Sequence, residues 1–174
     1  MKRIMVLTLG LLVGPALVSA QVEIGIDAGF SFESISGVDD NVIGFGLPTS
    51  GMRLGFMAGE QIIVETRMGA DYFKFGDNSG TDIDIVPGIN FLVNDQFYVR
   101  GEAGLTRSSF DDGTGSVSST QYLFGGAVGI RRPLGEGAVL RIEGGVDRWL
   151  ENSDDFIPAS TEVRVGIGVS AVVN

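Results

Sequence analysis

The stretch TEVRVGIGVSAVV, residues 161–173, decides the fold of this chain. Every second position, beginning with Thr161, is β-branched or small and mostly apolar, and the positions between them include Glu162, Arg164 and Ser170. Strict alternation over this length predicts a β-strand with one apolar and one polar face. A strand that crosses a bilayer at a tilt of ~45° needs about 9–11 residues, and this stretch supplies them.

The first twenty residues have the features of an export signal. A short basic start, Met1–Arg3, is followed by an almost wholly apolar run from Ile4 to Val13 and by Val18-Ser19-Ala20 before a cleavage site. An N-terminal membrane anchor is the alternative, but the apolar run is shorter than the ~20 residues of a spanning helix. We therefore expect a cleaved secretory signal peptide over residues 1–20 and one exported domain over residues 21–174.

The composition of the exported part restricts its chemistry. Once Lys2 and Arg3 are removed, ten basic residues remain against 22 acidic ones, which gives a net charge of −12. An acidic surface repels phosphate, so we expect no nucleic-acid partner. The chain has no cysteine and therefore no disulfide, and it has no histidine, which rules out a Ser-His-acid relay. We expect neither an enzyme nor a cofactor.

The alternation recurs throughout the exported part, with no helical periodicity. Two places interrupt it. Ile43 and Phe45 have the opposite parity to Met52 and its successors, so a bulge or loop is expected near residues 48–51. Pro87 lacks the N–H that a sheet ladder needs, and we assign a bulge to Pro87-Gly88. The eight alternating segments run approximately over residues 22–32, 43–58, 62–72, 82–91, 97–106, 122–131, 140–147 and 161–173.

The connections between these segments alternate in length. The expected tight turns cover residues 59–61, 94–96 and 133–137, and the expected longer loops cover residues 37–41, 76–80, 111–118 and 151–158. Short turns at one end and longer loops at the other are typical of outer-membrane barrels. The sequence thus predicts an all-β fold, an eight-stranded antiparallel up-and-down transmembrane β-barrel.

Alternation defines two faces but not which of them is inside. A soluble, lipocalin-like barrel turns its apolar face inward, whereas a membrane barrel turns it outward. Here the apolar face carries almost no charge, and the polar face combines glycines with arginine–acid pairs, which suits a narrow interior. Aromatic residues also gather near the segment ends, as in interfacial girdles. These features favour the apolar-out arrangement.

With these features the chain resembles the small eight-stranded outer-membrane β-barrel family of the outer membrane protein A and X type. The resemblance rests on the signal peptide, the eight amphipathic segments and the Arg/Glu pairs of the polar face, and it covers residues 21–174. It implies a monomer in a bacterial outer membrane, in contact with outer-membrane lipid. Barrels of this family usually end in an aromatic residue, whereas this chain ends Ala171-Val172-Val173-Asn174.

The polar face provides the candidate site. Eight strands leave an interior that side chains just fill, and charges there must be paired or solvated. We expect pairs between acids and arginines two residues apart, and together these predict a polar plug, with a narrow ion path as the alternative. The expected lumen ion-pair network comprises Arg53, Glu65, Arg67, Arg100, Glu102, Arg131, Arg141, Glu143, Glu162 and Arg164.

The acidic residues gather at the end that carries the longer loops. The predicted acidic outer mouth comprises Asp71, Asp82, Asp84 and Asp147, and the loops add Asp39, Asp40, Asp77, Asp111, Asp112, Asp154 and Asp155. This collection is either a solvated surface or a region that attracts divalent cations weakly. The expected function is a structural or adhesive outer-membrane barrel. The alternatives are a narrow, porin-like, cation-preferring pore and a soluble carrier of an apolar ligand.

Overall fold

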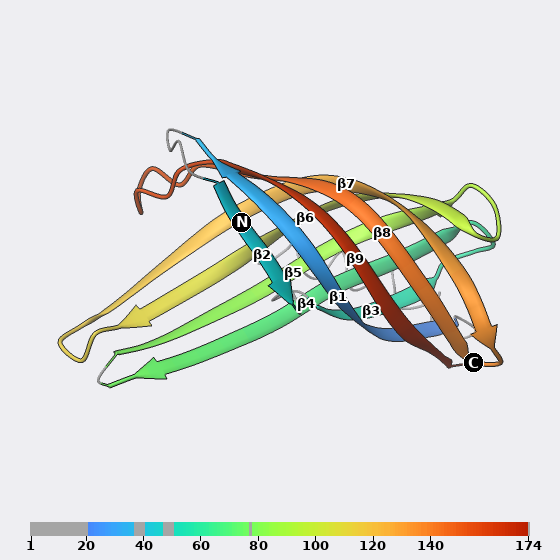
Figure 1. The fold of residues 1–174 in the computed structure, drawn as a ribbon, viewed down its shortest axis with the longest axis horizontal. Coiled ribbons are helices and arrows are strands. Elements are labelled where there is room, and N and C mark those ends of the chain that lie inside the picture. Colours follow the sequence, from blue (N-terminus) through green and yellow to red (C-terminus); the bar gives the residue numbers. More distant parts are fainter. Residues whose placement is uncertain (1–20, 37–40, 47–50, 77, 174) are drawn as a thin grey trace, which may run out of the picture.

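The computed structural model describes residues 21–36, 41–46, 51–76 and 78–173, with only the backbone for residues 41–46. The predicted signal peptide lies outside these residues. The described chain forms strands that join into a single antiparallel sheet, which closes on itself between β1 and β9 (Figure 1). The strands are β1 (Val22–Ile35), β2 (Asn41–Gly46), β3 (Met52–Met57), β4 (Ile62–Phe75), β5 (Asn78–Leu92), β6 (Phe97–Asp111), β7 (Ser116–Gly135), β8 (Ala138–Trp149) and β9 (Ser160–Val173).

The barrel wall has eight strands because β2 and β3 are two parts of one of them. β9 pairs with β1 along its whole length, while β3 pairs with residues 22–26 of β1 and β2 with residues 29–34. Gly46 stands opposite Gly29 and Met52 opposite Ile26, so the two paired stretches are separated by five positions of the sequence on one side and by two on β1. The expected break near residues 48–51 is confirmed, although residues 47–50 themselves lie outside the described part.

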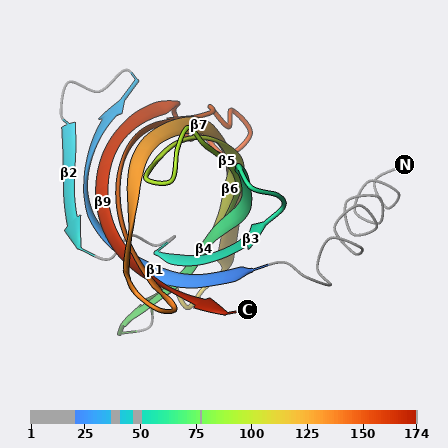
Figure 2. The ribbon, with the colours of Figure 1, turned by 90° about the vertical axis from the view of Figure 1, so that its right-hand side faces the viewer.

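The strands are staggered around the barrel. Cross-strand partners followed from Val22 through β3 to β9 lead back to β1 at Phe32, ten residues further along. Such a stagger requires tilted strands, and Figure 2 shows them curving around the lumen. Because of this stagger, inward side chains from different cross-strand rows can meet in the lumen.

The two faces of the sheet separate as the alternation predicts, with the apolar face outward. Val165 and Ile167 of β9 are 54% and 51% exposed, whereas Glu65 and Arg141 on the inner face are 0% and 1% exposed. A barrel with a charged interior and an apolar exterior cannot carry an apolar ligand in its lumen, so the lipocalin-like alternative is wrong. No helix in the described part is long and apolar enough to cross a membrane, a criterion that does not bear on strands.

Two local predictions are wrong. Pro87 causes no bulge: β5 keeps one register with both neighbours, and the ladder to β6 merely omits Val86 and Pro87. At this place β5 and β6 approach closely, because a Cβ at Gly104 would stand 2.7 Å from the Cα of Val86. Two of the loops at the outer end are also shorter than expected, because strand pairing continues to Phe75 and Asn78 in one and to Asp111 and Ser116 in the other. The β8–β9 connection, residues 150–159, is slightly longer than the expected 151–158.

Candidate functional site: the lumen of the barrel

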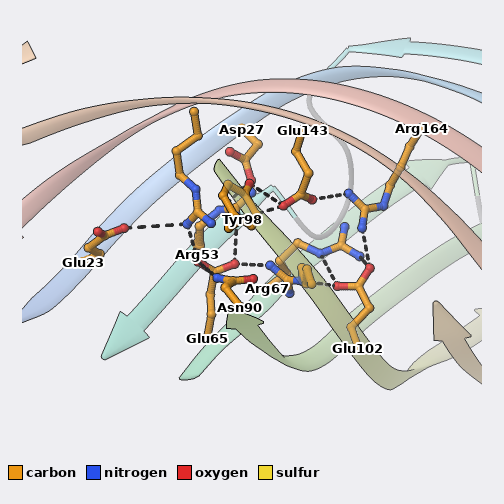
Figure 3. A network of polar contacts seen from close by, with 12 residues as sticks. Glu23, Asp27, Arg53, Glu65, Arg67, Asn90, Tyr98, Glu102, Glu143 and Arg164 are labelled. Carbon is orange, nitrogen blue, oxygen red and sulfur yellow. Dashed lines mark hydrogen bonds and ion pairs between the residues drawn. The ribbon is translucent and has the colours of Figure 1, made fainter. Parts of the chain in front are cut away.

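Six arginines and six carboxylates fill the inner part of the lumen and form one connected set of ion pairs. Figure 3 shows part of this set, together with Asn90 and Tyr98. Seven strands, β1, β3, β4 and β6–β9, contribute members at their inward positions, which alternate with lipid-facing ones. The set is electrically balanced, so no net charge is buried. We call it the lumen network; its members are Arg53, Arg67, Arg100, Arg131, Arg141, Arg164, Glu23, Asp27, Glu65, Glu102, Glu143 and Asp147.

Glu65 is the first centre of the lumen network. Its carboxylate is fully buried and accepts hydrogen bonds from Arg53 at 2.5 Å, from Arg100 and from Arg141. The amide of Asn90 donates a further bond at 3.3 Å. These donors come from β3, β5, β6 and β8, so one carboxylate ties together strands from around the barrel.

Glu102 and Arg164 make a second centre. Glu102 contacts Arg67 at 2.8 Å, Arg100 at 2.6 Å and the Arg164 guanidinium. Arg164 also donates to Glu143 at 2.5 Å and to Asp147 at 2.8 Å. Arg100 contacts both Glu65 and Glu102 and thereby joins the two centres.

An apolar layer adjoins the lumen network. Ile63, Leu92 and Tyr98 pack together inside the barrel and are almost completely buried. The hydroxyl of Tyr98 donates to Glu143 at 2.7 Å, and the Arg141 guanidinium lies 4.9 Å from the centre of the Tyr98 ring. Tyr98 lies directly over Gly129, where a Cβ would overlap the ring. Charged and apolar layers are therefore bonded to each other.

A cavity of about 540 Å³ occupies the lumen beyond the network, on the side of the β8–β9 loop. Seven members of the lumen network, among them Arg67 and Asp147, line it. The other charged residues that line it are all acidic, and the only tryptophan of the chain, Trp149, is part of the wall. These further acids are Glu33, Asp82, Asp84 and Glu162.

The structure gathers nine of the ten residues predicted for the lumen into the network, but with other partners than expected. Of the predicted pairs two residues apart, Arg100–Glu102 forms at 2.6 Å. Arg141 instead contacts Glu65 and Glu23, which face it across the lumen. The physical reason is that neighbours on one face of a strand stand about 6.6 Å apart, whereas a narrow lumen brings opposite walls closer.

Two acids lie in other parts of the lumen than the sequence predicted. Asp147 does not lie at the mouth; it is 1% exposed and is held by Arg164. Glu162 lies beyond the network and accepts a bond from the Trp149 indole at 3.4 Å. Asp82 and Asp84 line the cavity, and Asp71, which pairs with Asp82 across β4 and β5, is exposed.

The loop acids are not arranged as a metal site in the described part of the chain, where no group of three or more potential ligands converges. Asp112 instead holds its own turn, because its carboxylate accepts bonds from the hydroxyl and backbone N–H of Thr114 and from the N–H of Gly115. The Thr114 hydroxyl is the main cause of a lowered pKa at Asp112. Asp39, Asp40 and Asp77 lie outside the described residues.

The sequence reasoning missed four contributors: Glu23, Asp27, Asn90 and Tyr98. All four occupy inward positions of the alternation, which was the available signal. Glu23 and Asp27 have no arginine two residues away on β1, so a search for local pairs passes over them. In the structure Asp27 contacts Arg53 at 2.5 Å, and Glu23 contacts Arg131.

Solved structures of other proteins have a similar architecture. Neisserial surface protein A matches with a TM-score of 0.61 and 16% sequence identity, over 87% of this chain and 98% of that one. The chain has the fold of the small outer-membrane β-barrels. Ail, the attachment invasion locus protein of Yersinia pestis, solved in complex with the heparin analogue sucrose octasulfate, matches with a TM-score of 0.51 and 15% identity, over 90% of this chain and 100% of that one. No protein-family model and no curated protein matches the sequence.

This fold and the exposed apolar belt are those of an integral outer-membrane β-barrel. The aliphatic side chains of β9 and its neighbours would face lipid, and the charged residues would be shielded from it by the sheet.

Proposed function

We propose that this chain is a closed, non-enzymatic outer-membrane barrel whose lumen network acts as a plug and whose outer end makes adhesive contacts. The observation that carries the proposal is the balance of six arginines by six carboxylates in one connected set. Charges that pair so completely leave little attraction for a passing ion, because each is already neutralised at short range.

The apolar layer next to the lumen network strengthens the plug. Ile63 is 0% and Tyr98 1% exposed, so both side chains are tightly surrounded, which supports a closed lumen at this layer. An ion that crossed this layer would lose its hydration without polar groups to replace it. The cavity on the outer side would then end blindly at the charged network.

Conductance of the purified barrel in planar bilayers tests the plug. We expect no discrete current steps from the native protein at moderate voltage. Replacing Tyr98 and Ile63 by alanine removes two of the three side chains of the apolar layer and should allow brief openings. Stable cation-selective steps from the native barrel would contradict the plug and favour the narrow pore.

The outer end offers a surface for adhesive contacts. Phe73, Gly80, Phe110 and Val117 are direct neighbours across β4–β7, on the face of the sheet that lower down lines the lumen. The Phe73 and Phe110 rings are 6.3 Å apart, and the Phe73 ring covers Gly80, yet the two phenylalanines remain 50% and 44% exposed. Exposed apolar residues grouped in this way commonly mark contact sites. In Figure 1 the β4–β5 and β6–β7 hairpins extend farther to the left than the β8–β9 loop.

Cell attachment tests this contact surface. Cells that display the native barrel should adhere to a host-cell layer better than cells that display F110S/V117S at equal surface levels. Phe156, which is 92% exposed on the β8–β9 loop, provides a matched control through F156S. Equal adhesion by the native barrel and F110S/V117S would remove the adhesive half of the proposal and leave the plug unaffected.

A further inference from the structure

The basic residues outside the lumen network share one face of the sheet. Residues 21–174 contain ten basic residues, and the four that are not in the network all occupy outward positions of the strands. Asp111 is the only acidic residue at such a position in the described strands. A chain whose net charge is −10, or −12 without the predicted signal peptide, thus presents an outward face whose few charges are mainly positive. The four residues are Lys74, Arg107, Arg132 and Arg148.

Arg107 stands at the outer edge of the apolar belt. It follows Phe97, at the inner end of β6, by ten residues, and Val99 between them is 44% exposed. Ten residues of a strand tilted by 35–45° rise about 25 Å, which is roughly the height of the apolar band of a membrane barrel. Tyr122 is 57% exposed on the neighbouring strand and pairs with Leu105, one outward position below Arg107. Tyrosine is typical of this interface.

Arg148 reaches nearly the same level. Arg148 stands opposite Phe124 of β7, which in turn stands opposite Ala103 of β6. Because the strands are staggered by about one residue each, Arg148 lies two to three positions nearer the outer end than Ala103. Lys74 stands opposite Ser79 of β5, which stands opposite Asp111 of β6. The stagger places Lys74 two to three positions nearer the inner end than Asp111. The three cations therefore stand on alternate strands, β4, β6 and β8, about 10 Å apart around the rim.

These cations lack the partners that the lumen arginines have. Within the described residues, no carboxylate lies within 4.0 Å of the Arg107 or Arg148 guanidinium, and Arg148 donates only to the hydroxyl of Thr161, at 2.8 Å. An arginine at the lipid interface without a counter-ion favours an anion there. The guanidinium fork matches a phosphate group, to which it can bind through two parallel hydrogen bonds.

We propose that Arg107 and Arg148, with Lys74 beside them, bind the phosphate groups of anionic lipid headgroups at the outer edge of the belt. The proposal rests on the membrane-spanning barrel but not on the plug. It commits to lipid, because the site is continuous with the apolar belt, where only a headgroup can place its phosphate above Leu105 and Tyr122.

Native mass spectrometry of the barrel in a neutral detergent tests the proposal, with phosphatidylglycerol and phosphatidylcholine added in separate titrations. A basic residue near a membrane surface contributes about 1 kcal/mol to anionic-lipid binding, which is about fivefold in affinity. R107Q/R148Q should therefore bind phosphatidylglycerol roughly 30-fold more weakly than the native barrel and phosphatidylcholine equally well. R107K/R148K should retain most of the preference.

The controls separate a local site from general charge. Gln96→Glu changes the net charge as Arg107→Gln does, but at an exposed turn of the opposite rim, and should leave the preference unchanged. Equal loss in Q96E and R107Q, or an unchanged preference in R107Q/R148Q, would overturn the proposal. Each variant is first folded into phosphatidylcholine vesicles. A native barrel that fails to fold there refutes the membrane barrel itself, a result distinct from a folded barrel without lipid preference.

Discussion

Replacing Glu65 by glutamine should destabilise the barrel strongly. Glu65 is 0% exposed and contacts three guanidiniums, those of Arg53, Arg100 and Arg141. Glutamine keeps the shape and one acceptor oxygen, but it leaves the network with one excess positive charge. Removal of one partner from a buried ion pair costs about 3–5 kcal/mol, and we expect a loss in this range.

Urea unfolding of the barrel in lipid vesicles measures this loss, with the fluorescence of Trp149 and the electrophoretic shift between folded and unfolded forms as two signals. Glu162→Gln is the control, because Glu162 is only partly buried and its described contact is the Trp149 indole. We expect that control to change the free energy of unfolding by less than about 1 kcal/mol. A change of less than about 1 kcal/mol in the free energy of unfolding of E65Q would refute the charge-balanced network.

A second substitution tests whether neutrality itself matters. Arg141→Gln in the E65Q background restores the balance of the network, so the double variant should be more stable than the sum of the single losses implies, by about 1–3 kcal/mol. Additive losses would show that Glu65 and Arg141 act independently, although their contact is direct.

Three further outcomes follow from the structure. Gly129→Ala should cost about 1–3 kcal/mol because its Cβ overlaps the Tyr98 ring, while Gly101→Ala, with open space around it, should be nearly neutral in the same urea assay. Thr114→Val should raise the pKa of Asp112 toward its ordinary value, measured by carboxyl NMR titration; an unchanged pKa would mean that the hydroxyl is not its main stabiliser. Calcium should stabilise the barrel slightly more than sodium at matched ionic strength if the outer acids attract divalent cations, with dissociation constants of about 0.1–1 mM or weaker, and equal stabilisation would mean screening alone.

The fold was predictable because the alternation of apolar and polar residues can be read from neighbouring positions in the sequence. Each inward or outward position on β9 can be assigned from its neighbours, and the same parity correctly assigns Glu65, Arg100 and Glu143 to the lumen. The break after β2 was visible as a change of parity at Ile43. These features need no knowledge of distant contacts.

The partners inside the lumen were not predictable, because they depend on the stagger of the closed barrel. Glu65 and Arg141 are 76 residues apart and meet across the lumen only when all eight strands are in register. The prediction at Pro87 was wrong for a related reason: β5 keeps its register there through its pairing with β4 and β6, which the residues next to the proline do not show. The location of Asp147 inside the network likewise follows from Arg164, which reaches it from β9.

The direction in which β9 turns its two faces is the central claim, and cysteine scanning tests it most directly. The chain has no cysteine of its own, so single cysteines at positions 163–168 can each carry a nitroxide label in the vesicle-bound barrel. Collision with oxygen, which partitions into lipid, should be high at Val163, Val165 and Ile167 and low at the positions between them. The opposite alternation, or equal access of a water-soluble nickel reagent to both faces, would contradict the apolar-out barrel.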